Sequence, residues 1–300
     1  PICSSYLRAF GFSKEPLYAS IIGNVINFCL NAFFLFVLHK GVAGVATATV
    51  VSRIINLVIV VLLGAVLVKA KKHPERESNR EVMGQIIRIG LPSACETAIY
   101  NVSMTLVIRF LNQMDAQGLN VTARSYTMQI TNFSYCVGAA LAQANAIMTG
   151  WRIGAKEYDA CDRGTRKAAI IGVIVAVILE TMFALCSGWI MQLFSKDPQM
   201  VSLVGKLLAI DIVLEMGRVT NLVYGQALKT SGDAVFPVVM GACFMILCSV
   251  GGTYLFGIRL GLLAVGAYIG MAGDECVRAI GMYLRWKSGK WKEKGLVKSR

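Results

Sequence analysis

Four polar residues lie on one face of an apolar segment in the second half of the chain. Asp211, Glu215 and Arg218 are spaced i, i+4 and i+7, and Asn221 follows three residues later. This spacing puts all four on one side of an α-helix. Two carboxylates beside an arginine can bind a cation, or carry a proton where burial favours the neutral acid. A structural Glu215–Arg218 ion pair fits equally well, so coupling by Asp211 and Glu215 remains one of two hypotheses, with Arg218 and Asn221 as supports.

Glu96 is a further candidate coupling carboxylate, four residues after Pro92 in another apolar segment. The proline removes one backbone hydrogen bond, so we expect a local kink that opens space for a ligand. Glu96 is predicted to face this cavity, unless it only pairs with an arginine or amide of the bundle. Tyr100, one turn later, either stacks on a planar organic cation or serves in packing.

Amide side chains indicate additional polar faces. Asn24, Asn27 and Asn31 form a stripe on one apolar segment, and Gln129 lies on another. Lipid would leave such amides without hydrogen bonds, so they must face protein or a water-filled cavity. We expect these residues either to line a cavity or to bond neighbouring helices.

The remaining ionisable residues in apolar segments fit structural roles better. Glu180 has no charged neighbour in the sequence, so a buried hydrogen bond to another helix is expected. Asp274, Glu275 and Arg278 lie together in the last apolar segment. The i, i+3 spacing of Glu275 and Arg278 predicts an ion pair between them.

Sequence signatures of catalysis and metal binding are absent. The chain has two histidines, neither in an HExxH pattern, and no GxSxG motif or glycine-rich phosphate loop. Its nine cysteines are scattered without CxxC spacing, which indicates neither zinc nor disulfides. We therefore expect no enzyme activity, no metal and no cofactor. Nothing resembles a channel filter either.

The elements that position these residues are predicted to be membrane helices. Hydrophobic residues form 56% of the 300-residue chain and charged residues 16%, whereas soluble domains carry about 25% charged residues. The expected fold is an all-α polytopic membrane protein with about eight transmembrane helices of roughly 20 residues or more. The predicted spans cover residues 17–38, 42–68, 86–111, 121–148, 168–194, 200–228, 235–256 and 260–286.

Basic residues favour one side of this predicted bundle. Of the 30 Lys and Arg residues, 20 lie in alternate connections and the C-terminal tail, and only 3 lie in the other connections. Such a bias places the first set, and the C-terminus, in the cytoplasm. Basic loops that face anionic lipid headgroups also account for the net charge of +13 without nucleic acid. The expected location is the plasma or inner cell membrane.

An internal repeat gives the bundle an architecture. Leu7-Arg8-Ala9-Phe10-Gly11 before Pro16 matches Leu228-Lys229-Thr230-Ser231-Gly232 before Pro237, at a constant offset of 221. The two copies are six helices apart, so they point the same way, as in two parallel six-helix lobes. Residues 1–68 are then the last two helices of a first lobe, and Pro1 is not expected to be the native start. Residues 69–85 form a basic cytoplasmic loop, residues 86–286 a complete second lobe, and residues 287–300 a basic cytoplasmic tail.

The second turn resembles a known family. Ala227-Leu228-Lys229-Thr230-Ser231-Gly232-Asp233 followed by Phe236-Pro237 is similar to the LRGxGD turn of multidrug and toxic compound extrusion (MATE) transporters, with Lys229 at the usual arginine. The stretches 6–11, 89–92, 150–155 and 285–291 add to this resemblance. It implies helices five to twelve of a twelve-helix, two-lobe fold. We expect a monomer.

This resemblance also implies a function. MATE transporters export small organic, often cationic, compounds in exchange for Na⁺ or H⁺ by alternating access. Their second-lobe cation site draws on the seventh and tenth helices, which correspond to the segments of Glu96 and Asp211. The alternative is a lipid-linked oligosaccharide flippase of the same superfamily, which would favour a cationic cavity.

Overall fold

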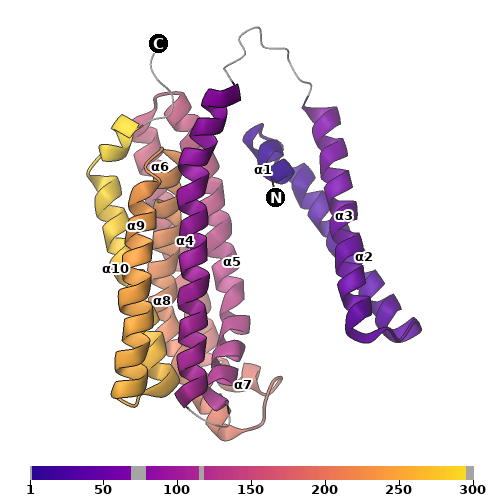
Figure 1. Cartoon of the computed structure of the whole chain (residues 1–300), viewed down its shortest axis with the longest axis vertical. Coiled ribbons are helices and arrows are strands. Elements are labelled where there is room, and N and C mark those ends of the chain that lie inside the picture. The colour runs from indigo at the N-terminus through magenta and orange to yellow at the C-terminus, as the bar shows by residue number, and fades with distance from the viewer. Residues whose placement is uncertain (1, 69–78, 115–117, 295–300) are drawn as a thin grey trace. The chain divides into compact units, whose positions relative to one another are not determined.

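The protein is built from helices, as the computed structural model shows for residues 2–68, 79–114 and 118–294 (Figure 1). These residues contain no strands, and four of their helical stretches are long and apolar enough to cross a membrane, which confirms the predicted all-α polytopic membrane fold. The chain divides into two units, Pro1–Arg76 and Glu77–Arg300. Each unit is described by itself.

The first unit is a pair of long helices with a short leading helix. The helix α1 (Ile2–Ala9) precedes α2 (Lys14–Ala32), which continues as the π-helical segment η1 (Phe33–Val37). The following helix α3 (Gly41–Leu67) packs along α2. Leu7, Ala19 and Val60 form the small buried core of this unit.

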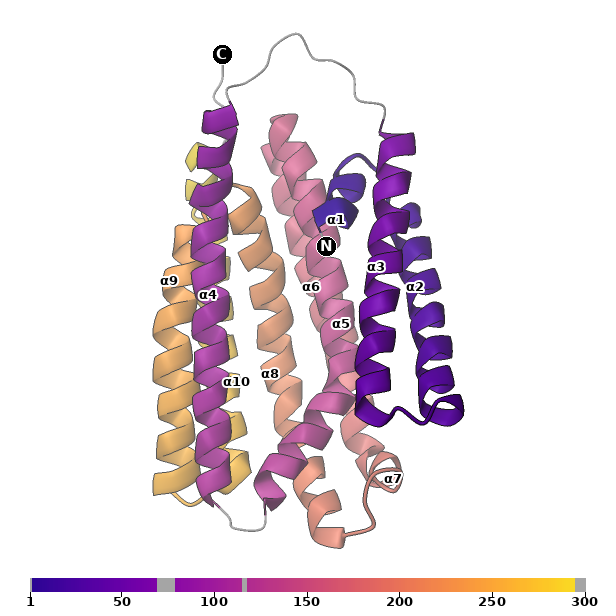
Figure 2. The ribbon, with the colours of Figure 1, turned by 45° about the vertical axis from the view of Figure 1, so that its right-hand side comes forward.

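The second unit is a helical bundle in which α8 is central. This helix packs against α5, α6 and α10 (Figure 2). Its elements are α4 (Asn79–Met114), α5 (Leu119–Gly154), α6 (Tyr158–Leu185), α7 (Ser187–Met191), α8 (Pro198–Thr230), α9 (Val235–Phe244), the π-helical segments η2 (Met245–Val250) and η3 (Thr253–Arg259), α10 (Leu263–Lys287) and the 3₁₀-helix η4 (Lys290–Lys294).

Helices cover most of all eight predicted spans, although several boundaries differ. The helix α4 begins at Asn79, inside the predicted loop of residues 69–85, because polar residues extend a helix beyond the apolar stretch that hydropathy detects. The span predicted for residues 168–194 breaks at Cys186, where α6 ends and α7 follows. The helix α4 continues through Pro92.

The helices separate into two classes by hydropathy. In the described residues, four stretches are long and apolar enough to cross a membrane: Lys14–Val37, Gly41–Leu67, Tyr158–Leu185 and Val235–Arg259. The long helices α4, α5, α8 and α10 are not among them, because they carry most of the ionisable and amide residues. Charged residues in a membrane bundle almost always face its interior or a water-filled cavity.

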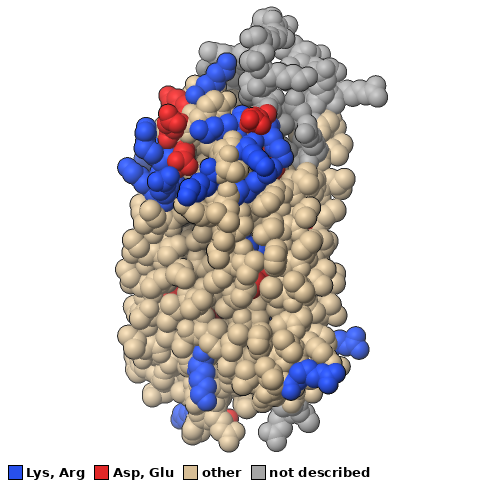
Figure 3. All heavy atoms as spheres, turned by 90° about the vertical axis from the view of Figure 1, so that its left-hand side faces the viewer, with Lys and Arg blue, Asp and Glu red and all other residues tan. Residues whose placement is uncertain are grey.

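The outer surface of the second unit agrees with a position in a bilayer. Large apolar side chains such as Leu185, Leu247 and Leu284 are exposed. Figure 3 shows a broad belt with few charged atoms and, at one end, the larger cluster of Lys and Arg, with some acids among them. We call this end of the second unit the basic end. A surface of this kind is stable in lipid and would aggregate in water.

The repeated turn adopts the same backbone in each unit. Gly11 has φ +89° and Gly232 has φ +93°, a conformation that glycine adopts without strain. The Gly11 amide donates to the Arg8 carbonyl (3.0 Å), and the Gly232 amide donates to the Lys229 carbonyl (3.1 Å). The next helix begins three residues after each glycine, at Lys14 and Val235.

Candidate functional site

A cavity of about 450 Å³ lies inside the second unit. Its walls come from α4, α5, α8 and α10, with contributions from α9 and η2. The wall is unusually charged for a helical bundle that crosses a membrane. The ionisable acids and bases that line it are Glu96, Arg124, Asp211, Arg218, Lys229, Asp274, Glu275 and Arg278.

The helix α8 brings its polar face to this cavity. The helix starts at Pro198, and the Asp197 side chain caps it by accepting a hydrogen bond from the Gln199 amide (3.0 Å). At Gly217, a Cβ atom would lie 2.9 Å from the backbone of α10. Glycine therefore permits the close approach that carries the neighbouring Arg218 to the acids of α10.

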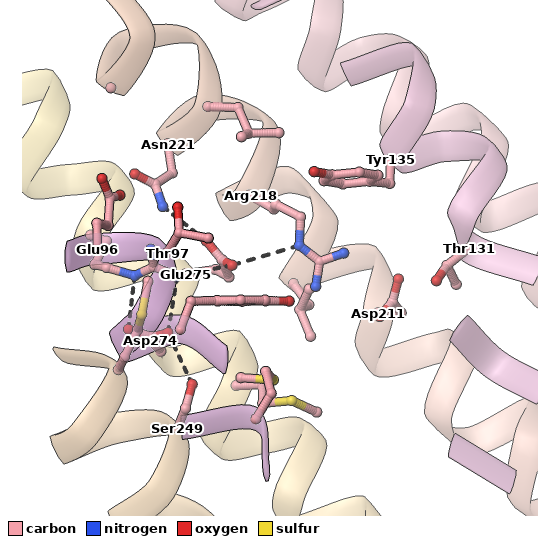
Figure 4. Close-up of a pocket in the computed structure, with 18 of the residues that line it drawn as sticks. Glu96, Thr97, Thr131, Tyr135, Asp211, Arg218, Asn221, Ser249, Asp274 and Glu275 are labelled. Atoms are coloured by element: carbon pink, nitrogen blue, oxygen red, sulfur yellow. Dashed lines mark hydrogen bonds and ion pairs between the residues drawn. The ribbon is translucent and has the colours of Figure 1, made fainter. Parts of the chain in front are cut away.

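A chain of ion pairs joins α8 to α10 (Figure 4). The Arg218 guanidinium contacts Glu215 at 2.7 Å and Glu275 at 3.6 Å. Arg278 in turn contacts Glu275 and Asp274, both at 2.9 Å. The predicted pairs Glu215–Arg218 and Glu275–Arg278 are thus both present, and they belong to one network.

Hydrogen bonds extend this network to other parts of the wall. The Asn221 amide donates to Glu275 (3.0 Å), and the Ser249 hydroxyl of η2 donates to Asp274 (2.9 Å). The Tyr135 ring lies 5.9 Å from the Arg218 guanidinium, close enough for a cation–π contact (Figure 4). Each arginine of the network is therefore neutralised within the cavity wall.

Glu96 of α4 makes an ion pair with another helix of the cavity wall. Its carboxylate lies 2.5 Å from the Lys229 ammonium at the end of α8, without the alignment of a hydrogen bond. Both side chains are 19% exposed. An arginine or amide was the expected alternative partner for Glu96, whereas the partner found is Lys229 of the repeated turn.

Two buried acids of the second unit make no ion pair among the described residues, although Arg218 lies within electrostatic range of Asp211. Asp211 is 2% exposed and Glu180 is fully buried. One oxygen of Asp211 and both oxygens of Glu180 make no hydrogen bond of full geometry to a described residue, although the Ser134 hydroxyl of α5 lies within interaction range of Glu180, on the neighbouring helix that the prediction required. Glu215, with one unpartnered oxygen, lies within electrostatic range of both. Isolated buried carboxylates of this kind attract a proton or a cation.

The structure brings most, but not all, of the predicted site residues together. Glu96, Tyr100, Asp211, Arg218 and Asn221 line the cavity. Glu215 is buried behind the lining. Gln129 is exposed on α5 and lies outside this cavity.

The predicted asparagine stripe belongs to the first unit. Asn27 donates a hydrogen bond to Ser52 (3.1 Å), and Asn31 donates to Asn27 (3.1 Å). The first bond joins α2 to α3, in agreement with interhelical bonding, and the second lies within α2. Asn24 is exposed. A role for the three asparagines in lining a cavity stays a prediction.

Sequence reasoning missed several lining residues. Arg124 and Tyr268 are nearly buried in α5 and α10, and Lys229 seemed to be a loop residue. A signal for Arg124 existed, because an arginine within an apolar segment is a candidate functional residue. Among the described residues, no three His, Cys, Asp or Glu side chains are placed to hold a metal ion.

Comparison with known sequences identifies similar proteins. A model of the MatE family matches residues 92–255. The "Uncharacterized transporter YisQ" of Bacillus subtilis is 33% identical over 98% of this chain and 66% of its own length. The "Probable multidrug resistance protein NorM" of Thermotoga maritima is 23% identical over 99% of this chain and 64% of its own length.

Solved structures show the same fold. A eukaryotic MATE transporter superposes with a TM-score of 0.87 at 18% identity, over 96% of this chain and 65% of its own. A MATE protein in the straight conformation gives a TM-score of 0.84 at 20% identity, over the same shares. The chain thus spans slightly less than two thirds of the length of these proteins.

Proposed function

The chain belongs to the MatE family of transporters, and on this premise we propose that it supplies the second lobe of an antiporter. This antiporter exports organic, often cationic, compounds in exchange for Na⁺ or H⁺. The end of the first lobe is included in the chain. Membership in a transporter family favours this function over an enzymatic one. Similarity to proteins named for multidrug resistance supports the substrate class.

The unpartnered carboxylate of Asp211 is the observation that carries this proposal. It lines the cavity, yet its side chain is almost fully buried and lacks an ion pair among the described residues. An isolated anion in a membrane bundle is expensive, by several kcal/mol. Binding of a proton or Na⁺ to Asp211 removes this penalty, so the cavity is more stable with one of these ions bound than without it.

Exchange follows if the substrate competes with the coupling ion. An organic cation in the cavity would neutralise Asp211 in place of Na⁺ or H⁺, so each weakens binding of the other. The lobe conformations would then respond to whichever ligand is bound, through their different affinities for it. Alternating access of the cavity to the two sides converts this competition into antiport.

Glu96 adds a second place for the coupling ion. The Lys229 ammonium already neutralises this carboxylate, and a bound Na⁺ or proton would release Lys229. Because Lys229 ends α8 and Glu96 lies on α4, this exchange would loosen a contact between two helices of the lobe. Occupancy of Glu96 therefore affects helix positions as well as charge.

Two observations speak against the flippase alternative. Three of the four bases in the cavity wall are neutralised by acids, so the cavity is not cationic. The similar proteins of known sequence include several multidrug transporters by name. We further propose that the basic end and the C-terminus face the cytoplasm of a monomeric cell-membrane protein.

Ion-gradient-driven efflux of a cationic dye from cells that express the full-length protein tests the proposal. Asp211→Asn and Glu96→Gln should each abolish most of the efflux driven by the relevant gradient, whether Na⁺ or H⁺. Asp159→Asn, which removes an exposed acid outside the cavity, should retain it. Protein levels in the membrane are measured in every strain.

Unchanged efflux in both cavity variants would refute the proposed ion site of the second lobe. Flipping of a labelled lipid-linked oligosaccharide without dye efflux would establish the flippase instead. Separate imposition of a Na⁺ gradient and a pH gradient on vesicles identifies the coupling ion.

A further inference from the structure

Arg124 is a buried arginine in the cavity wall that the proposed ion exchange does not use. It lies in the second turn of α5, where its residue exposure is 8%, and it lines the cavity. The N-terminus of a helix carries a partial positive charge. Neither burial nor the helix dipole therefore favours a cation at this position.

Arg124 has no anionic partner among the described residues. One terminal nitrogen contacts the Met104 sulfur at 3.8 Å, a weak interaction. The Nε atom is buried and has no hydrogen-bond partner. The arginines Arg218 and Arg278, which line the same cavity, both pair with carboxylates. Arg124 is thus the unsatisfied base of the described cavity wall.

The unpaired base and the unpaired acid of the cavity lie near a common residue. Tyr268 of α10 is within electrostatic range of both Arg124 and Asp211. All three side chains line the cavity. The wall therefore offers to the same ligand one positive and one negative group that have no ion pair among the described residues.

We propose that Arg124 binds the carboxylate of a zwitterionic organic ligand, whose positively charged part faces Asp211. This inference rests on the proposed export function and specifies its substrate class. A guanidinium presents several N–H donors in a planar fork that matches a carboxylate. A ligand with both charges satisfies Arg124 and Asp211 together, whereas a simple cation leaves the buried Arg124 unpaired.

A matched pair of dyes tests this assignment. Rhodamine B carries a carboxylate and a delocalised cation, and its ethyl ester carries the cation alone. Binding of each dye to the purified full-length protein in nanodiscs is measured by fluorescence polarisation. The variants are Arg124→Gln, Arg124→Lys and, as a control, Arg259→Gln, which changes an exposed arginine outside the cavity.

We expect Arg124→Gln to lose the preference for rhodamine B over its ethyl ester. Arg124→Gln should weaken binding of rhodamine B by roughly tenfold or more, since a charge-assisted hydrogen bond is lost. Binding of the ester should change by less than about twofold. Arg124→Lys should recover part of the affinity for rhodamine B, because it restores the charge without the fork. The control should bind both dyes as the wild type does.

Other outcomes overturn the assignment. Equal weakening of both dyes, with a lowered melting temperature, would show that Arg124 serves the structure, for instance by pairing with Asp211 in another conformation. A wild type that prefers the ester would also contradict it. Gradient-driven export of both dyes is measured in parallel. Export of neither dye would refute the antiport proposal, while unchanged rhodamine B binding in Arg124→Gln would refute only the present inference.

Discussion

The two copies of the repeated turn have one backbone and two different surroundings. In both, a buried leucine (Leu7 or Leu228) precedes a glycine with positive φ, and the next helix starts three residues later. At the position after the glycine, the first copy has Phe12 and the second has Asp233. The repeat thus preserves the shape of the turn and changes what the turn contacts.

The second copy is held by charge and the first by apolar packing. Phe12 packs against the small core of the first unit. The Asp233 carboxylate, fully buried, accepts hydrogen bonds from Arg285 of α10 and Lys294 of η4, each at 2.7 Å. One aspartate therefore joins the end of α8 to α10 and to the segment after it. The same turn can therefore be a simple corner between helices or a clamp that joins several elements.

The Asp233→Asn substitution should remove the charged contacts of the second turn. It should have the largest effect on stability of the changes considered. The neutral amide loses two ion pairs at a buried position, although Arg285 and Lys294 can both reach water afterwards. We expect a loss of about 2–4 kcal/mol in the free energy of unfolding, somewhat below the range for a fully buried pair. Denaturation in mixed detergent micelles measures this value for the purified protein.

The comparison change in the first copy is Arg8→Gln, which removes a charge from that turn. Arg8 occupies the position of Lys229 and is only partly buried, so its removal should change stability by less than about 0.5 kcal/mol. A loss below about 1 kcal/mol for Asp233→Asn would show that the second turn is no clamp.

Alanine at the two glycines tests the backbone conformation that the two turns share. Gly11→Ala and Gly232→Ala each force a side chain into the left-handed region, which destabilises by roughly 1–2 kcal/mol. A Cβ atom on Gly11 meets nothing within 4 Å, so its effect is that of the backbone alone. Similar losses in both variants, measured by the same denaturation, would confirm a shared backbone requirement. A harmless change at either glycine would contradict it.

The sequence predicts interactions within one helix better than those between helices. The pairs Glu215–Arg218 and Glu275–Arg278 follow from helical spacing alone, and both are found. The Glu96–Lys229 contact joins two helices, so it depends on their rotation and depth in the membrane, which hydropathy does not fix. The sequence pattern also does not reveal the close approach of α8 to α10 at Gly217.

The same reasoning applies to the fold and to the cavity. Long apolar stretches and the repeat predict the helices well, because a bilayer demands about 20 apolar residues for each span. The cavity was only partly predicted. Arg124 is a candidate binding residue because no acid of the described residues pairs with it, and this is known only once the packing of the helices is known.

Acidification should weaken the clamp in the second turn and leave the first turn unaffected. Burial alone would raise the pKa of the Asp233 carboxyl, but Arg285 and Lys294 outweigh it and hold that pKa below its ordinary value. A carboxyl with a lowered folded-state pKa adds stability above its unfolded pKa of about 3.9. This stability is lost as the pH falls through the folded-state pKa.

The stability gap between the wild type and Asp233→Asn should therefore respond to pH. We expect a constant gap from about pH 8 to pH 5, and a decrease of up to roughly 1 kcal/mol for each pH unit below about pH 4. Parallel denaturation series of the two proteins measure the gap. A gap that widens at acid pH would mean that the Asp233 pKa is raised instead.

The smallest expected effect is that of Lys294→Gln, which separates the two arms of the clamp. The Lys294 side chain is 43% exposed, whereas that of Arg285 is 18% exposed. An exposed ion pair contributes about 0.2–1 kcal/mol, so the loss in stability should be about 0.5 kcal/mol. Arg285→Gln, measured in the same denaturation, should cost more than Lys294→Gln.

The segment that carries Lys294 should remain docked in this variant. Trp291 is buried and stacks on Trp286 with ring centroids 4.2 Å apart, and its Nε1 donates to the Trp286 carbonyl (3.0 Å). Limited proteolysis at the lysines of η4 reports docking directly, and Trp291→Ala provides the undocked reference. Rapid cleavage of Lys294→Gln would mean that the ion pair, and not the tryptophan stack, holds this segment against the bundle. The charge of Asp233 would then be needed for the position of the segment as well as for the strength of the turn.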